Sequence, residues 1–130
     1  MPQPADHDDP TPAPLTGIQV IDLSTQIAGP YCTKLFADAG ADVVKVEPPE
    51  GDPLRRYAAT RPVPEGEDGP LFRFLNAGKR SIVAAPHSER VDALLAGADL
   101  LVEDLPDGVL DIDAIRTRHP HLVVVSITPF

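Results

Sequence analysis

GIQVIDLSTQIAGPYCTKLFADAGADVVKVE, residues 17–47, is the stretch that decides the fold class of this chain. Its two ends, residues 17–23 and 41–47, are β-branched runs and predict two buried strands. Between them, Pro30 suits the first turn of a helix and Gly40 suits its C-terminal cap. Four residues there form one apolar stripe: Tyr31, Leu35, Phe36 and Ala39. This spacing is that of a βαβ unit, which predicts two parallel strands joined by a right-handed crossover.

The alternation of strands and helices continues to the end of the sequence. Residues 48–70 are too rich in proline and glycine for a regular element and predict a long surface loop. Beyond it we expect a helical turn at 71–75, helices at 89–96 and 112–118, and strands at 81–85, 100–103 and 122–127. The predicted fold class is α/β, a Rossmann-like parallel sheet with flanking helices. Because the last strand is apolar on both faces, we expect part of the sheet to be bare and the chain to be the incomplete front part of a larger fold.

Composition argues against several classes of protein. The chain has 130 residues and a net charge of −9, which argues against nucleic acid and anionic membranes as partners. The single Cys32 excludes an internal disulfide and a cysteine-based zinc site, and no apolar run reaches the roughly 20 residues that span a bilayer. We expect residues 1–14, rich in proline and aspartate, to be a disordered tail, residues 15–130 to form one domain, and the protein to be soluble and cytoplasmic.

Three groups of residues could carry chemistry, and each also has a purely structural interpretation. Cys32 could be a reactive thiol early in a helix or a small buried apolar residue. His119 and His121 could bind a metal or be solvated loop residues, and no third ligand lies nearby in the sequence. Six cations could form a site for a phosphorylated small molecule or pair with neighbouring acids: Arg55, Arg56, Arg61, Arg73, Lys79 and Arg80.

The expected topology indicates where a ligand would lie. Ligands of parallel α/β sheets bind beyond the carboxyl ends of the strands. The segments that follow the strands include residues 26–30, 47–48, 84–87 and 104–106. The helix start at Gly29-Pro30 adds free backbone N–H groups, which favour a phosphate or carboxylate. Neither GxGxxG nor GxxxxGK[ST] occurs, so a dinucleotide, flavin or response-regulator interpretation has only the fold class to support it.

Five segments together resemble the family III CoA-transferases, the CaiB/BaiF family. They are PLTGIQVIDLS (14–24), IAGPYCTKLFADAGADVVKVEPPEGDPLR (27–55), LNAGKRSI (75–82), ADLLVEDLPDGVL (98–110) and HPHLVVVSITPF (119–130). The specific part of the match is the succession of AGP, GADVVKVEPPEGDPLR and GKRS. The resemblance covers the chain from Pro14 onward and corresponds to the N-terminal portion of the family only.

The resemblance implies that residues 15–130 are a Rossmann-like CoA-binding domain from an interlocked homodimer of much longer chains. Its partners would be acyl-CoA or CoA and the remainder of the fold or a homodimer partner. Coenzyme A would be a substrate, and no metal is implied. Lys79 and Arg80 could hold a phosphate of CoA or only order the loop before them. The CoA-contacting segments of the family match Ile27, Ala28, Ala84, Ala85, Pro86, His87, Asp104, Leu105 and Pro106 in this sequence.

The resemblance assigns no catalytic residue to this chain. The family's aspartate nucleophile follows a glycine-rich stretch that comes after the segment matched by SITPF (126–130), so we expect no transferase turnover from residues 1–130 alone.

Departures from the family pattern keep a second interpretation open. Asp104 and Leu105 stand where the family has an amide and an aromatic residue, and Asp111 and Asp113 stand where members carry an arginine. Extra negative charge near the phosphates of CoA is unfavourable. It would suit a non-catalytic module that acts in assembly or binds a ligand weakly.

Overall fold

A computed structural model describes residues 11–128, and within them five strands form a single sheet. All strand pairs are parallel, and the order across the sheet is β3-β2-β1-β4-β5. This arrangement confirms the α/β, Rossmann-like parallel sheet expected from the sequence. Most of the expected tail, residues 1–10, lies outside the described residues. The strands are β1 (Gln19–Leu23), β2 (Asp42–Glu47), β3 (Arg80–Val83), β4 (Leu100–Glu103) and β5 (Val123–Ser126).

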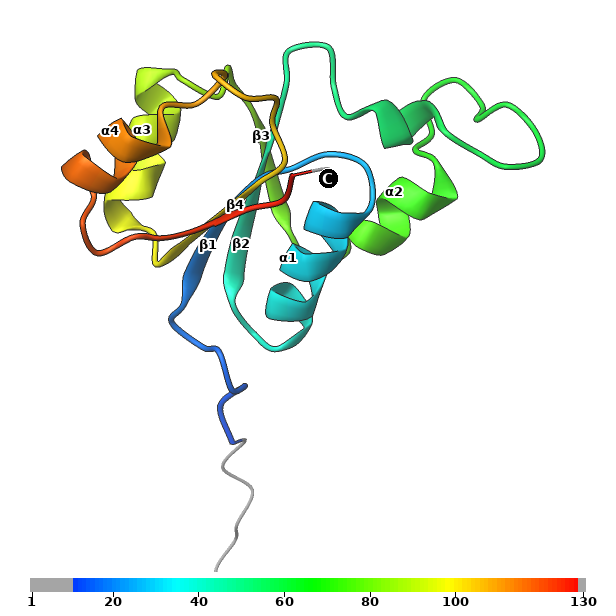
Figure 1. Ribbon diagram of the computed structural model, residues 1–130. Coiled ribbons are helices and arrows are strands. Elements are labelled where there is room, and N and C mark those ends of the chain that lie inside the picture. Colours follow the sequence, from blue (N-terminus) through cyan, green and yellow to red (C-terminus); the bar gives the residue numbers. More distant parts are fainter. Residues whose placement is uncertain (1–10, 129–130) are drawn as a thin grey trace, which may run out of the picture.

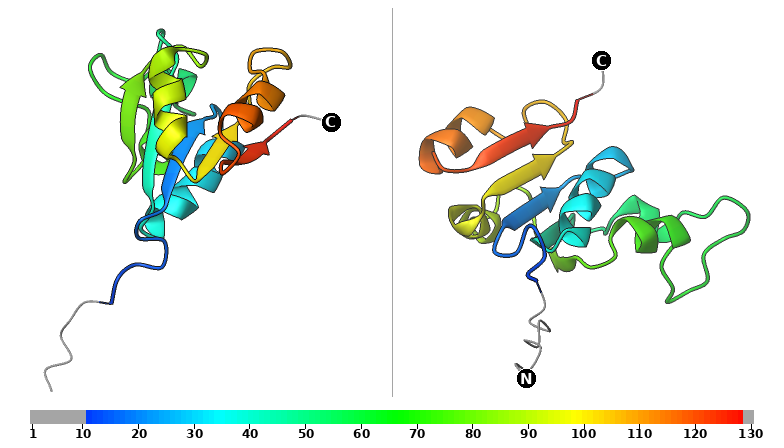
Figure 2. Two further views of the ribbon diagram at one scale, coloured as in Figure 1. Left: turned by 90° about the vertical axis from the view of Figure 1, so that its left-hand side faces the viewer. Right: turned by 90° about the horizontal axis from the view of Figure 1, so that it is seen from below.

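Helices cover the two faces of this sheet (Figure 1). α1 (Ala28–Asp38) and α2 (Pro70–Leu75) lie on one face, and α3 (Glu89–Gly97) and α4 (Ile112–Arg118) lie on the other. A 3₁₀ helix not expected from the sequence, η1 (Pro53–Arg56), interrupts the long loop after β2. Figure 2 shows that this loop projects well away from the sheet.

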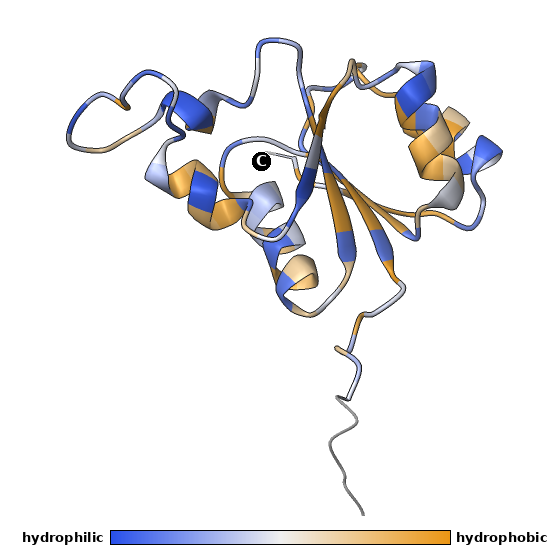
Figure 3. Ribbon diagram, turned by 180° about the vertical axis from the view of Figure 1, so that it is seen from behind, coloured by the Kyte–Doolittle hydropathy of each residue, from blue (hydrophilic) through white to orange (hydrophobic). Residues whose placement is uncertain are grey.

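The alternation of side chains along the strands produces two apolar cores. Ile21 and Val44 point toward α3 and α4, where they pack with Leu95. Val20 and Val43 point the other way, toward α1. Apolar stretches run along the strands and along parts of the helices that cover them, and charged residues interrupt the strands (Figure 3). On β5, Val123 and Val125 remain 59% and 39% exposed, which is the bare part of the sheet expected from the sequence.

His119 and Cys32 have structural roles. His119 lies at the C-terminal cap of α4 and is only 6% exposed, and its Nε2 atom lies 3.1 Å from an Asp92 carboxylate oxygen on α3. The interpretation of His119 as a solvated loop residue is therefore wrong, because the end of α4 packs against α3. Cys32 packs against the α1-side core, and burial, followed by the charge of Asp22, raises the pKa of its thiol. Residues 11–128 hold no group of three His, Cys, Asp or Glu side chains placed to bind a metal.

A buried ion pair joins β1 to the segment before β3 beneath α1. The Lys79 Nζ atom lies 3.0 Å from an Asp22 carboxylate oxygen, and both side chains are at most 1% exposed. Lys79 also donates hydrogen bonds to the Thr33 hydroxyl, at 2.7 Å, and to the Pro30 carbonyl, at 2.9 Å. The pair therefore attaches the first turns of α1 to the sheet.

A second buried pair lies beside the first. Lys45 is the register partner of Asp22 on the neighbouring strand, so both point toward α1. Its Nζ atom lies 2.9 Å from an Asp52 carboxylate oxygen and donates to the Ser24 carbonyl at 2.9 Å. Burial alone would raise the pKa of Asp22, but the two lysines and hydrogen bonds from Ser24 and Thr33 hold it below its ordinary value. Asp22 is therefore ionised, and its charge is compensated by buried cations.

Replacing Lys79 should destabilise the fold far more than replacing its neighbour Arg80. The Lys79→Met variant leaves Asp22 buried and without its ion pair, which costs about 3–5 kcal/mol of unfolding free energy. The Arg80→Met variant loses only an exposed pair with Asp42, worth less than about 1 kcal/mol. Urea unfolding of both variants measures the difference, and equal losses would contradict a buried structural pair.

Candidate functional site

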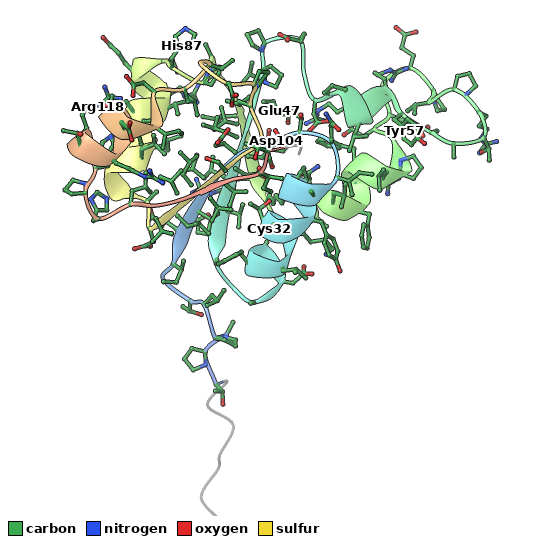
Figure 4. The ribbon with its side chains drawn as sticks, in the orientation of Figure 1. Cys32, Glu47, Tyr57, His87, Asp104 and Arg118 are labelled. Atoms are coloured by element: carbon green, nitrogen blue, oxygen red, sulfur yellow. The ribbon has the colours of Figure 1, made fainter. Side chains whose placement is uncertain are left out.

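The strand order reverses direction between β1 and β4, and this places a crevice at their carboxyl ends. The chain passes from β1 to β2 and β3 on one side, then returns to β4 and β5 on the other. In parallel α/β sheets, ligands bind at such a reversal, outside the carboxyl ends of the strands. Figure 4 shows Asp104 and Glu47 at this end of the sheet. We call the loops after β1 and β4, residues 24–27 and 104–106, with the adjoining 84–87 segment, the strand-end site.

The loops after β1 and β4 are joined by one contact. The backbone N–H of Thr25 donates to both carboxylate oxygens of Asp104, at 2.9 and 3.0 Å. The next residue, Gln26, has a φ of 58°, a left-handed conformation that residues other than glycine rarely adopt. Ile27 follows and is 56% exposed at the start of α1.

The first turn of α1 faces the strand-end site with no side chain to cap it. Its N-cap residue is Ile27, which makes no capping hydrogen bond, and Pro30 supplies no N–H of its own. Gly29 allows this approach, because a Cβ atom there would lie 2.1 Å from the Ser24 Cβ. The AGP motif therefore brings a helix N-terminus against the sheet edge, where its backbone N–H groups favour an anion.

Residues from all four expected strand-end segments line, or lie beside, hollows at this edge. A small apolar recess of about 50 Å³ lies among Leu23, Thr25, Val46, Pro48, Ala84, Pro86 and Leu105. A larger cleft of about 280 Å³ between α3 and α4 begins at Pro86 and His87. Pro106 lines a further hollow beside Leu105, and the Ala85 carbonyl accepts a hydrogen bond from the Ser88 N–H at 3.0 Å. Ile27 and Ala28 begin α1 over the same edge.

Lys79 and Arg80 lie apart from this site. The Lys79 ammonium group donates to the protein beneath α1, including the Asn76 side-chain oxygen at 2.9 Å. Arg80 begins β3, at the opposite end of that strand, and donates to both carboxylate oxygens of Asp42, at 2.9 and 2.6 Å. These contacts favour the interpretation that the two residues order their surroundings. Their role as phosphate ligands stays a prediction.

The arginines of the long loop also make contacts within the chain. Arg55 donates to both oxygens of Glu47, at 2.7 and 2.6 Å, and to Asp68 at 2.7 Å. Arg56 donates to the carbonyl of Val63 at 2.7 Å. Arg55 supports the interpretation that the loop cations pair with acids, whereas Arg56 donates to backbone carbonyls and supports neither interpretation. Sequence reasoning did not identify Glu47 as the main partner of Arg55. The one sequence signal for it was that Glu47 lies two residues after Lys45, and therefore on the same face of the strand.

Two carboxylates near this edge have pKa values displaced in opposite directions. Burial would raise the pKa of Glu47, but hydrogen bonds from Arg55 and then Ser81 lower it to about 2. Burial raises the pKa of Asp104, the Thr25 N–H opposes that rise, and the charge of Asp22 adds to it. Glu47 is therefore a firmly ionised anchor, whereas Asp104 is a half-buried acid at the strand-end site itself.

Among the described residues, no helix combines the length and apolar character needed to cross a membrane.

Comparison with known proteins identifies one family. The model of CoA-transferase family III matches residues 15–130. The chain is 39% identical over 132 residues to the succinate–glutarate CoA-transferase of Agrobacterium fabrum, a match that covers 90% of this chain and 32% of that protein. It is 36% identical over 126 residues to the cinnamoyl-CoA:phenyllactate CoA-transferase of Clostridium sporogenes, covering 88% of this chain and 30% of that protein.

A solved structure supports the same relationship. The chain superimposes on a CaiB/BaiF family protein from Brucella suis with a TM-score of 0.81 and 37% identity, covering 92% of this chain and 34% of the other. The chain therefore spans about a third of the length of the relatives that it matches.

The low pKa of Glu47 predicts part of the acid sensitivity of the fold. Because that pKa lies near 2 in the folded state and near 4.5 ordinarily, ionised Glu47 stabilises the fold above pH 4.5, and this contribution is lost as the pH falls toward 2. This contribution of ionised Glu47 to the free energy of unfolding amounts to about 3 kcal/mol. The Glu47→Gln variant should be less stable at neutral pH and should lack this acid-dependent loss.

Urea unfolding between pH 7 and pH 2 measures that dependence, with Glu50→Gln on the exposed loop as the matched control. If the free energy of unfolding fell equally steeply toward pH 2 in Glu47→Gln and in the unmodified chain, the Glu47–Arg55 contact would contribute nothing to the acid sensitivity.

Proposed function

This chain belongs to CoA-transferase family III, and from that membership we propose that residues 15–130 are the N-terminal CoA-binding part of an enzyme that moves CoA between an acyl-CoA and a carboxylic acid. The observation that carries the proposal is the gathering of the β1, β3 and β4 loops at one sheet edge, around the uncapped start of α1. The match covers only 32% of the Agrobacterium relative, so the complete transfer reaction, which needs the rest of such a protein, is also part of this proposal.

The chemistry of this edge suits the two ends of a CoA molecule. Backbone N–H groups at the start of α1 would receive a phosphate, since a helix N-terminus and its dipole favour an anion. Apolar walls at Leu23, Val46 and Leu105 would contact the uncharged part of the ligand. The recess of about 50 Å³ holds only a fragment, so CoA would lie across the open edge.

In this proposal the chain binds and orients the thioester, and the nucleophile comes from elsewhere. The family's aspartate would lie beyond Phe130, in the larger remainder of the protein or in a homodimer. It would form an acyl intermediate and then a CoA thioester, dividing one difficult transfer into easier steps.

A second candidate is a non-catalytic CoA-transferase-like module. The observation that favours it is the acidity of the region: Asp104 is half-buried at the site, and Asp107, Asp111 and Asp113 are exposed after it. Each such charge near a phosphate is unfavourable by about 1 kcal/mol at ~4 Å in water.

CoA should raise the melting temperature of the 130-residue chain, because a ligand that binds only the folded state stabilises it. The Ile27→Glu variant should weaken CoA binding by about five- to tenfold, since it places a carboxylate at the proposed phosphate position. Tyr31→Glu, one turn farther along the exposed side of α1, is the matched control and should bind normally. Calorimetric titration measures the affinities.

An unchanged melting temperature in millimolar CoA would count against the enzyme part and support the module. If Ile27→Glu and Tyr31→Glu weakened CoA binding equally, the phosphate would not bind at the start of α1.

The 130-residue chain should give no CoA transfer of its own. We expect no new thioester when it is incubated with succinyl-CoA and glutarate, the acids in the name of the Agrobacterium relative, because the proposed nucleophile is not among residues 1–130. Mass spectrometry of the thioester pool measures this, and turnover that scales with the amount of purified chain would refute the placement of the nucleophile.

A further inference from the structure

We propose that Asp104 is a positioning residue, whose carboxylate holds the Thr25 N–H and thereby fixes the left-handed turn at Gln26 and the start of α1. This inference rests on the proposed function only where it concerns CoA. The contact itself joins residues 79 positions apart in the sequence.

The geometry shows that the turn is held from two sides. The Ser24 N–H donates to an Asp22 oxygen of β1 at 3.0 Å, and the next N–H, that of Thr25, donates to Asp104 after β4. Glu103 accepts the N–H of Leu105 at 2.9 Å and so fixes the loop that carries Asp104. Two consecutive N–H groups are thus anchored, one to β1 and the other to the loop after β4.

The backbone at Gln26 explains why such anchoring is needed. Its φ of 58° is disfavoured for a side chain larger than glycine. Conformations of this kind persist only where the surroundings impose them. The anchored Thr25 N–H directly precedes Gln26, and Ile27 and Ala28 of the proposed CoA site directly follow it. The contact therefore acts on the backbone that would receive the ligand.

The opposite role for Asp104 would be simple repulsion of CoA. Its carboxylate is surrounded by like charges from Asp22 and Glu103 and by the cation of Lys45. Burial raises its pKa, and the Thr25 N–H opposes that rise. If repulsion were its whole effect, removing the charge in any way would tighten binding. Positioning requires that the hydrogen-bond acceptor be kept.

Two substitutions separate the acceptor from the charge. Asp104→Asn keeps an acceptor oxygen and removes the charge, whereas Asp104→Ala removes both. Asp107→Asn removes the same charge from an exposed residue three positions later and is the matched control. The first measurement needs no ligand, because it follows the Thr25 amide by ¹⁵N NMR.

We expect the Thr25 amide signal to titrate with Asp104, at a pH above the ordinary aspartate value of 3.8. This step should vanish in Asp104→Asn and persist in Asp107→Asn. Hydrogen exchange at Thr25 should be about tenfold faster in Asp104→Ala, which loses the hydrogen bond, and clearly less accelerated in Asp104→Asn, which keeps a neutral acceptor. A titration step that persists in Asp104→Asn, or unchanged exchange in Asp104→Ala, would overturn the proposal. If Asp104→Ala does not fold, the titration in Asp104→Asn decides.

The second measurement is CoA affinity by calorimetry. Positioning predicts that Asp104→Ala binds about tenfold more weakly and that Asp104→Asn binds at least as well as the unmodified chain. Tighter binding by Asp104→Ala would overturn the proposal in favour of repulsion. If the unmodified chain does not bind CoA, the proposed function fails, and the amide measurements still decide the role of Asp104.

Discussion

The ion pair between Asp22 and Lys79 is the interaction on which the arrangement of the strand-end site depends. It connects β1, the segment before β3 and the first turns of α1 in one buried contact. Two apolar residues would fill the same space without the desolvation cost of burying charges, so the pair is not explained by stability alone. What the pair adds is a defined orientation of α1 relative to the sheet. The lysine donates to the Pro30 carbonyl and to the Thr33 hydroxyl, and these two contacts favour the observed placement of α1.

That fixed position explains the other close contacts at the edge. With α1 held against the sheet, Gly29 meets Ser24 at a distance that no side chain could occupy. The turn between them must then be short, and Gln26 takes the left-handed conformation that closes it. Asp104 completes the arrangement from the neighbouring strand. The close approach at Gly29 and the left-handed turn at Gln26 therefore follow from the helix placement that the buried charge pair fixes.

The helices and strands could be predicted from the sequence, because each depends on the pattern of residues within a short segment. The βαβ unit, the later helices and the strands are all present, because apolar periodicity determines them over a few residues. In the structure, side chains of Ser88 and Asp111 cap the starts of α3 and α4. Strand order was beyond that reasoning, since nothing local decides which strands pair. The strand-end segments could nevertheless be predicted as neighbours, because the carboxyl ends of parallel strands share one edge whatever their order.

The charged residues show where sequence reasoning fails. Lys79 and Arg80 are adjacent in the sequence, so one shared role as cations was expected for them. In the structure, however, Lys79 is buried under α1, and Arg80 pairs with Asp42 at the start of β2. Arg55 is likewise engaged by Glu47 and Asp68. These cations are engaged by acids of the same chain, which favours the interpretation that they order their surroundings. An anion at the strand-end site would instead meet backbone N–H groups, whose partial charge depends on orientation. The site therefore depends on accurate backbone placement, and a half-buried aspartate, unfavourable to an anion by its charge, can still favour binding by holding that backbone in place.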